Sequence, residues 1–400
     1  MKIAMVSVHS NPLGKGVDPL GAHVAGLAAA LAGLGHEVAV YSRRADPELP
    51  DRVRTDRGFD VVQVAAGPAE SLADAEVLAH LGDFTSSLTR EWGVTPPDVV
   101  HGHGWMSGLV SVLGARRAGA PVVQTFHSLA TPGRRCATGG PAERGKIEVL
   151  VGREVAHVVA AGSDEAFALA GKGVNRKKIS IVGSGVDIDA FTPEGPRARR
   201  DRMYRVVVAS PPPAARGIDG VLIALSRVDC AELLITGLPD GTRPDGEREV
   251  AELRARAEKF GVASRTTFVG KVPHESMPAL LRSADAVVCA PAGEPSGGIA
   301  VEAMACGVPV VATATGEFAD IVVDGITGLL VPPDDTESQA RALRRLLMDD
   351  TLRQECAIAG RDRVSARYSW DHVAQEVLRA YERAGATSQV TTAVSPDPAR

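Results

Sequence analysis

Short apolar segments alternate with longer segments rich in alanine and leucine along the first half of the chain, and this alternation constrains the fold more than any other feature. Residues 2–8 and 37–41 have the length and composition of buried strands, whereas residues 23–34 and 75–92 are typical of helices. Strands that alternate with helices form a mostly parallel sheet with right-handed crossovers and helices on both faces. The first half therefore predicts a doubly wound α/β domain.

The same alternation returns after a polar, arginine-rich stretch that follows Pro193. It begins with an apolar strand at residues 206–209, and later pairs a strand at 286–289 with a helix at 298–306. A chain of 400 residues is longer than one hydrophobic core usually organises. We therefore predict two Rossmann-like, doubly wound domains that face each other across a cleft. Their predicted boundaries are 1–195 and 205–368.

The last part of the chain has two different compositions. Residues at about 370–384 are predicted to form a helix that packs back on the first domain. Residues 386–400 are rich in Ala, Ser, Thr and Pro, so this tail has little to bury and is predicted to be disordered. Ligands of doubly wound sheets bind at the carboxyl ends of the strands, so the cleft between the domains is the expected site.

Composition excludes several classes of protein. The formal net charge of −5 argues against a nucleic-acid partner, which needs a basic excess or stripe. The five cysteines are scattered and never in CxxC spacing, which favours reduced thiols in a cytoplasmic protein. No stretch approaches the roughly 20 apolar residues of a transmembrane helix, and the N-terminal apolar run is too short for a signal peptide. We expect a cytoplasmic protein without an integral membrane segment, and leave a homodimer open.

The segment from Glu294 to Pro309 is the most informative for chemistry. It follows an apolar strand, places Gly297 and Gly298 at a turn, and then starts a helix. Backbone N–H groups at such a helix start can bind a diphosphate. Glu294 and Glu302 flank the turn, and carboxylates accept hydrogen bonds from sugar hydroxyls. From the spacing alone, a purely structural glycine turn with two surface glutamates is an equal alternative.

Several motifs together resemble family 4 of the retaining GT-B glycosyltransferases. The two glutamates have the E-x7-E spacing of that family, and a Gly-x-Pro-Val-Val-Ala strand follows at 307–312. The resemblance covers nearly the whole chain. Its other motifs are Ser-Val-His-Ser-Asn-Pro-Leu at 7–13, Gly-His-Glu-Val at 35–38, His-Gly-His at 101–103, Thr-Phe-His at 125–127, Gly-Val-Asp-Ile-Asp-Ala-Phe-Thr-Pro at 185–193 and the segment 324–333.

The resemblance implies a nucleotide diphosphate sugar, with UDP or GDP, as the donor substrate, and neither a metal nor another cofactor. In the account favoured for this fold, the acceptor attacks on the face from which the nucleotide departs, and the enzyme positions the reactants and stabilises the leaving diphosphate. The implied catalytic residues are His127, beside the reacting sugar, and Glu294, on its hydroxyls. The implied donor-binding residues are Gly21, Arg216, Gly297, Gly298 and Ile299 for the diphosphate, and Glu302 for the ribose.

Four positions depart from the family pattern. Arg216 stands where a lysine is usual, and Ser210 replaces an arginine, so one of two cations that counter the diphosphate is altered and the other is absent. Ser296 replaces an aromatic residue, and Leu20 replaces the first glycine of a Gly-Gly pair. These changes indicate either a specialised donor pocket or a weakened enzyme.

The nearest subgroup by motif is the actinobacterial inositol-phosphate N-acetylglucosaminyltransferases of mycothiol synthesis. The lysine, tyrosine and threonine that read the acceptor phosphate there align near Asp74, Gly104 and Ser128, while Arg144 retains the arginine. An acid in place of a cation disfavours a phosphate. We therefore predict a non-phosphorylated acceptor, such as an aminocyclitol or a betaine thiol of antibiotic biosynthesis. The predicted acceptor-binding residues are Asn11, Asp74, His103, Ser128 and Arg144.

Other interpretations stay open from the sequence. Inositol phosphate is the alternative acceptor, because the alignment in this loop-rich region can be shifted by a few residues. A catalytically inactive nucleotide-sugar-binding protein would also explain Ser210 and Ser296. A non-hydrolysing epimerase shares the architecture, but the E-x7-E spacing speaks against it. The sequence identifies neither the sugar nor the accepting atom.

Overall fold

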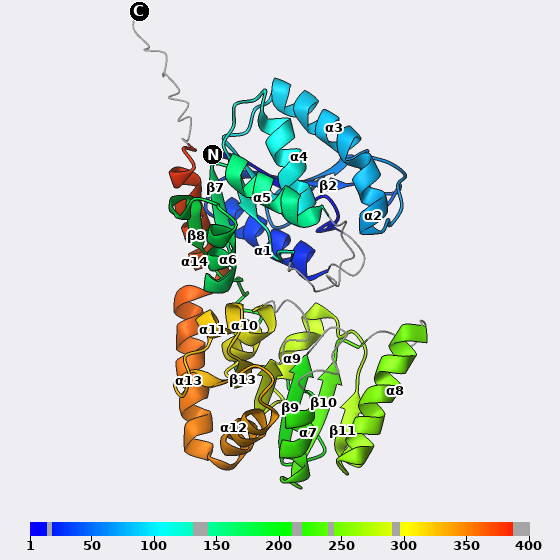
Figure 1. Cartoon of the computed structure of the whole chain (residues 1–400), viewed down its shortest axis with the longest axis vertical. Helices are drawn as coiled ribbons and strands as arrows, with labels where there is room; N and C mark the ends of the chain where they lie inside the picture. The colour runs from blue at the N-terminus through cyan, green and yellow to red at the C-terminus, as the bar shows by residue number, and fades with distance from the viewer. Residues whose placement is uncertain (14–17, 131–142, 210–217, 239–243, 290–296, 387–400) are drawn as a thin grey trace, which may run out of the picture.

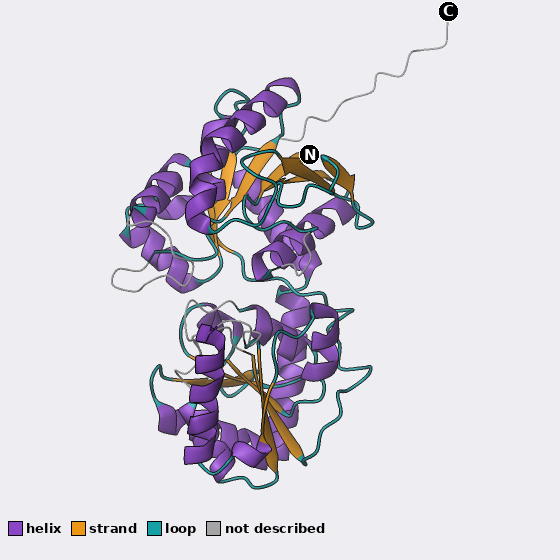
Figure 2. Cartoon of the chain, turned by 90° about the vertical axis from the view of Figure 1, so that its right-hand side faces the viewer, coloured by secondary structure: helices purple, strands orange, loops and turns teal. Residues whose placement is uncertain are grey.

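The computed structural model describes residues 1–13, 18–130, 143–209, 218–238, 244–289 and 297–386, and it contains two α/β units, each with its own sheet (Figure 1). Helices lie on both faces of each sheet (Figure 2). The predicted pair of doubly wound domains is confirmed. No helix in the described ranges is long and apolar enough to cross a membrane.

The first sheet is eight-stranded within the described residues, with the order β3-β4-β2-β1-β5-β6-β7-β8. All neighbours are parallel except β3, which pairs antiparallel with β4 at the edge. The central strand β1 is buried at four of its five positions, which is why its sequence is almost continuously apolar. The strands are β1 Lys2–Val6, β2 Glu37–Arg43, β3 Arg52–Arg54, β4 Asp60–Val64, β5 Val99–His103, β6 Val122–Thr125, β7 His157–Ala160 and β8 Ile179–Ile181.

Helices α1 to α6 belong to the same part of the chain. The predicted helix at 75–92 is interrupted: α2 and α3 are separated by a 3₁₀ turn at Leu78–His80. A second 3₁₀ turn, Arg176–Lys178, precedes β8. The helices are α1 Pro19–Gly33, α2 Asp74–Val77, α3 Leu81–Val94, α4 Trp105–Ala115, α5 Arg144–Glu154 and α6 Ser163–Gly171.

The second sheet is six-stranded within the described residues and entirely parallel, with the order β11-β10-β9-β12-β13-β14. Its strands are β9 Tyr204–Ala209, β10 Ala231–Thr236, β11 Thr266–Phe268, β12 Ala286–Cys289, β13 Val310–Thr313 and β14 Gly328–Val331. Its helices are α7 Asp219–Ser226, α8 Pro244–Lys259, α9 Met277–Leu281, α10 Gly298–Ala305, α11 Glu317–Ile321, α12 Thr336–Met348 and α13 Asp350–Arg367. Two 3₁₀ turns, Ala263–Arg265 and His274–Ser276, precede β11 and α9.

The last helix, α14 (Trp370–Arg383), returns from the second unit to the first (Figure 1). Its buried residues join the core formed by β1, β2 and α1. The indole of Trp370 fills the space beside two glycines: a Cβ on either Gly26 or Gly185 would lie 2.3 Å from it. The absence of a side chain at these two positions therefore allows α14 to pack closely against the first unit.

Candidate active site

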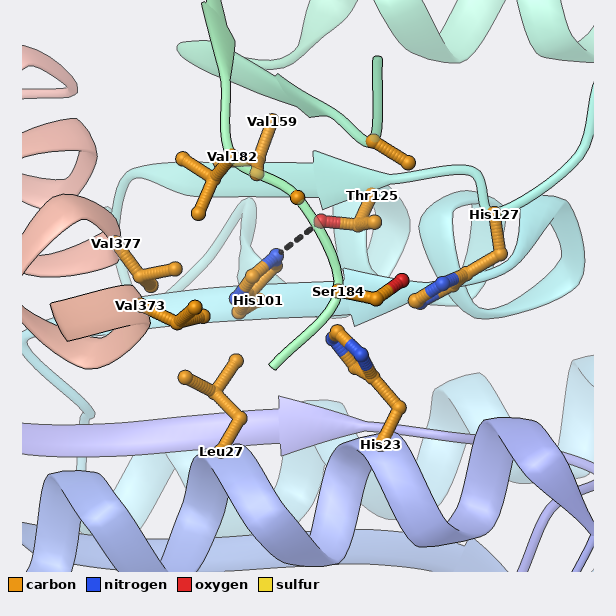
Figure 3. A pocket seen from close by; sticks show the side chains of 12 residues that line it. His23, Leu27, His101, Thr125, His127, Val159, Val182, Ser184, Val373 and Val377 are labelled. Carbon is orange, nitrogen blue, oxygen red and sulfur yellow. Dashed lines mark hydrogen bonds between the residues drawn. The ribbon is translucent and has the colours of Figure 1, made fainter. Parts of the chain in front are cut away.

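Histidine side chains from three elements meet at the carboxyl ends of β5 and β6. His103 is the last residue of β5, His127 lies two residues beyond β6, and His23 comes from the first turns of α1. Nδ1 of His103 lies 3.0 Å from Nε2 of His127. The His23 and His127 rings are 4.9 Å apart between centroids, and Figure 3 shows them pointing toward each other beside Ser184. The structure thus brings together His103 and His127, which were predicted to bind acceptor and donor sugar.

His127 has an unusual backbone conformation. Its φ is 60°, one of two positive φ values among the described non-glycine residues. Such a conformation costs of order 1–3 kcal/mol and is found mainly where the surrounding structure imposes it, as at functional sites. In this conformation the imidazole lines the pocket at the carboxyl ends of β5 and β6.

Burial keeps these imidazoles uncharged. It lowers the pKa of His23 to about 4 and that of His101 to about 3. The pKa values of His103 and His127 lie well below the ordinary value, first because of burial and then because neighbouring imidazoles would repel a second positive charge. Near neutral pH, His127 can therefore exchange hydrogen bonds with a sugar hydroxyl as a neutral ring.

His101 is a structural histidine next to this group. Its Nδ1 is 2.9 Å from the Tyr381 hydroxyl of α14, and its Nε2 is 2.9 Å from the Thr125 hydroxyl. Both nitrogens are thereby satisfied, and Figure 3 shows the bond to Thr125. His101 ties α14 to the end of β6, directly behind His103.

The start of α10 packs against a carboxylate that sequence reasoning missed. Glu317, in α11, accepts a hydrogen bond from the Gly297 backbone and another from the Ser184 hydroxyl at 2.9 Å. A Cβ on Gly297 would lie 2.2 Å from Ile321 and 2.7 Å from Glu317. A side chain at Gly297 would therefore force Ile321 and Glu317 to shift, and this constraint comes from the position of α11, which no local sequence pattern indicates.

Gly298, Ile299 and Glu302 lie on α10 as predicted from the turn. Gly298 is its first residue, Ile299 is in the first turn, and Glu302 is one turn further. Desolvation raises the pKa of Glu302 to about 8, although its side chain remains 20% exposed. Nδ1 of His274 is 3.8 Å from this carboxylate. The binding roles of these residues stay predictions.

The N-terminus of α1 already holds a carboxylate. Asp18 is the N-cap residue, and it accepts a hydrogen bond of 2.6 Å from the backbone N–H of Gly21. Its other oxygen accepts one of 2.8 Å from Ser10. A diphosphate that binds near Gly21, as predicted, would therefore lie next to the Asp18 carboxylate.

Two of the predicted acceptor residues are bonded to each other. Nη2 of Arg144 donates to the Ser128 hydroxyl at 2.8 Å, and its Nε donates to Glu148 at 2.7 Å. The Arg144 and Glu148 side chains are 5% and 0% exposed, so this is a buried ion pair. Arg144 thus bonds to the residue that follows His127, with its charge compensated by Glu148.

In the described part of the chain, Asn11 and Asp74 form no hydrogen bond with the histidines, and the remaining predicted residues are not described. Asn11 donates to Gln63 of β4 at 2.8 Å, and Asp74 is the half-buried first residue of α2. Glu294 and Arg216, with the substituted positions Ser210 and Ser296, lie outside the described residues. Besides Glu317, the site residues that sequence reasoning missed are His23 and Ser184. His23 had a signal, because it is the polar residue at the start of an otherwise apolar helix.

Contacts between the two units lie beside this pocket. Ser163 and Asp164 at the start of α6 bond to Asp320 and to the Gly316 N–H, respectively. Ser184, on the segment after β8, bonds through its hydroxyl to α11. The pocket is lined by the first unit and by α14, and one of its lining residues, Ser184, makes this contact with the second unit.

Two family models match this chain, one in each of the two units. Residues 20–190 match the family model "Glycosyltransferase Family 4", and residues 206–363 match "Glycosyl transferases group 1". A D-inositol 3-phosphate glycosyltransferase of Jonesia denitrificans is 33% identical over 98% of this chain and 98% of its own.

Two solved structures share the fold. Sucrose-phosphate synthase of Thermosynechococcus elongatus has a TM-score of 0.82 and 25% identity, covering 95% of this chain and 98% of its own. Anabaena HepE in complex with UDP and glucose has a TM-score of 0.73 and 16% identity, covering 96% and 99%. With these matches spanning both units, the chain belongs to glycosyltransferase family 4 and is a glycosyltransferase of the retaining GT-B type.

Proposed function

We propose that the chain transfers a sugar from a nucleoside diphosphate sugar to a small cyclitol acceptor, and that inositol phosphate is the first acceptor to test. One observation supports this acceptor most: the identity of one third to a D-inositol 3-phosphate glycosyltransferase extends over nearly the whole of both chains. The motifs of the first domain point the same way, since they include the acceptor-side residues Asn11 and Arg144.

On the donor side, α10 supplies the expected groups. Its N-terminal N–H groups and positive helix end attract the diphosphate. Glu302 is positioned one turn along the helix to accept hydrogen bonds from ribose hydroxyls. Because its pKa is raised to about 8, the bound hydroxyls have to compete with a proton for this carboxylate.

In the first unit, neutral His127 is the group that we assign to the transferred sugar of the donor. Its ring is held by His103, and its backbone by the strained turn after β6. A fixed, uncharged ring orients a sugar hydroxyl without adding a charge that would disfavour positive charge at the reacting carbon. Catalysis is then a matter of positioning the acceptor and stabilising the departing diphosphate.

The test is a transfer assay with inositol phosphate and a panel of UDP and GDP sugars, read by mass spectrometry of the product. We expect one nucleotide class to support transfer. At pH 9, where the Glu302 carboxylate is charged, Glu302→Gln should weaken nucleotide binding about ten- to a hundred-fold by calorimetry, as expected for lost bonds to a charged group. The exposed Glu258→Gln is the matched control. Nucleotide binding without any transfer would instead support the alternative of a catalytically inactive nucleotide-sugar-binding protein.

A second acceptor class is supported by a specific observation. Arg144 is neutralised by Glu148, and the alignment puts Asp74 at the position of the lysine that binds the acceptor phosphate in the related enzymes. These two features favour a non-phosphorylated acceptor such as an aminocyclitol or a betaine thiol. Competition between inositol phosphate and the free cyclitol or amine, at equal donor concentration, distinguishes the two classes.

A further inference from the structure

Glu317 is a buried acid to which the proposed mechanism assigns no role. It is the first residue of α11 and is 9% exposed. Removing a carboxylate from water is costly unless hydrogen-bond donors or a cation compensate its charge. In the described part of the chain, the groups that act on this carboxylate are Ser184, the Gly297 backbone and Asp320, none of which is a cation. The hydrogen bonds from Ser184 and Gly297 are thus what compensates its burial there.

These two hydrogen-bond donors belong to different parts of the donor site. Ser184, in the first unit, donates its hydroxyl hydrogen to Oε2 of Glu317 at 2.9 Å. It lines the same pocket as His23 and His127, and Figure 3 shows it next to both rings. Gly297 is the N-cap of α10, whose N-terminal N–H groups we assign to the diphosphate. One carboxylate thus connects the wall of the sugar pocket to the helix start assigned to the leaving group.

Backbone from both units encloses Glu317. A Cβ on Gly297 would lie 2.7 Å from Oε2 of Glu317 and 3.2 Å from its Cβ. On the other side, a Cβ on Gly162, which lies between β7 and α6, would be 3.4 Å from the Cα of Glu317. Both units therefore approach this residue where they carry no side chain of their own. A side chain enclosed in this way has little room for another rotamer, so it couples the position of α10 to that of the first unit.

We propose that Glu317 is a positioning residue of the transfer reaction, which through Ser184 and Gly297 fixes the start of α10 relative to the sugar pocket around His127. The inference rests on the proposed donor site and adds the residue that sets the distance between its two parts. Transfer requires the reacting groups to be held in one geometry, and a misplacement of about 1 Å can lower the rate about a hundred-fold. Free nucleotide needs only the second unit, so its binding does not depend on this connection.

The experiment measures transfer and nucleotide binding in the full chain and in Ser184→Ala, which removes the hydroxyl bond to Glu317 and leaves the bond to Gly297. We expect kcat to fall about ten-fold or more, while the Kd of the free nucleotide, measured by calorimetry, changes by less than about two-fold. A role confined to the start of α10 would instead raise Kd. A role confined to packing would lower only the melting temperature.

A double-mutant cycle with Glu317→Ala tests whether Ser184 acts through this carboxylate. Once Glu317 is removed, the additional Ser184→Ala change should not lower kcat further, because coupled residues are not additive. The control is Glu355→Ala, an exposed acid on α13 that should change neither kcat nor Kd. The melting temperature establishes whether each variant is folded, and Ser184→Ala, which loses a single hydroxyl, keeps the test decisive if Glu317→Ala does not fold.

Three results overturn the inference. The first is an unchanged kcat in Ser184→Ala, and the second is a Kd that rises as much as kcat falls. The third is a double variant in which Ser184→Ala lowers kcat as strongly as it does alone, because Ser184 would then act on the sugar directly. An unmodified chain that transfers no sugar overturns the proposed function together with this inference, whereas active transfer that Ser184→Ala leaves intact overturns this inference alone.

Discussion

The carboxylate of Asp320 accepts two hydrogen bonds from Ser163, one from the backbone N–H at 2.6 Å and one from the hydroxyl at 2.7 Å. Ser163 begins α6 of the first unit, and Asp320 belongs to α11 of the second. A reciprocal bond of 2.7 Å runs from the Gly316 N–H to Asp164. The two units are thus joined by paired contacts between an acid of one unit and a helix start of the other, next to the pocket.

Asp320→Asn is expected to loosen this junction. The amide cannot accept both bonds with the strength of a carboxylate, and because the contact is exposed we expect a loss of only about 1 kcal/mol. Small-angle scattering should show a larger radius of gyration, and limited proteolysis should cut faster between the units. Asp362→Asn, on the exposed face of α13, should change neither. An unchanged scattering curve for Asp320→Asn would show that other contacts hold the junction.

Glu302 makes the stability of the ligand-free chain depend on pH. Burial raises its pKa from 4.5 to about 8, so the folded chain binds this proton more tightly than the unfolded chain. The resulting stabilisation is fully present below about pH 4.5 and is lost as the pH rises through about 8. Glu302→Gln, which mimics the protonated form, should therefore melt at a higher temperature than the unmodified chain at pH 9 and at the same temperature at pH 4.5.

The matched control for this comparison is Glu258→Gln, an exposed glutamate on α8. It should shift the melting temperature equally at both pH values. A Glu302→Gln variant whose difference from the unmodified chain does not change between pH 4.5 and pH 9 would contradict a raised pKa at this position.

Gly297 should not tolerate a side chain. In Gly297→Ala the new Cβ would overlap Ile321 and crowd Glu317, at 2.2 and 2.7 Å, and overpacking of this kind typically costs about 1–3 kcal/mol. Urea unfolding of the second unit should report the loss. Gly82→Ala, on α3, is the control, because nothing lies within 4 Å of the position that its Cβ would take, and it should be neutral or stabilising by up to about 1 kcal/mol. Equal stability of both variants would mean that α11 can move away.

The elements that a sequence can predict are those whose burial is uniform. Residues 206–209 are a strand as predicted, because Val206, Val207 and Val208 are buried on both faces of the second sheet. The edge strand β3 was not predicted, since it has three residues and its burial alternates without any buried position. The prediction of one helix at 75–92 was wrong, because a 3₁₀ turn at Leu78–His80 divides this segment into two helices.

The site was predictable in position but not in contacts. His103 and His127 could be placed at one edge because parallel strands end together. The pairing of Glu317 with Gly297, and of Asp320 with Ser163, depends on how α11 docks, which no local pattern encodes. His23 comes from a helix whose facing direction is set only when α14 covers it.

Among the acids near the site, Glu148 is expected to contribute most to the stability of the fold. Glu148→Ala would leave Arg144 buried without its counter-charge and would remove the acceptor for the Ala130 N–H. Breaking a buried pair from one side costs about 3–5 kcal/mol, and chemical denaturation should show a loss of this size. The exposed pair Arg248–Glu252 has the same i, i+4 spacing, so Glu252→Ala is the matched control and should cost at most about 0.5 kcal/mol. If Glu148→Ala cost no more than Glu252→Ala, Arg144 would have to find solvent or another acid, and its charge would then be available to an acceptor phosphate after all.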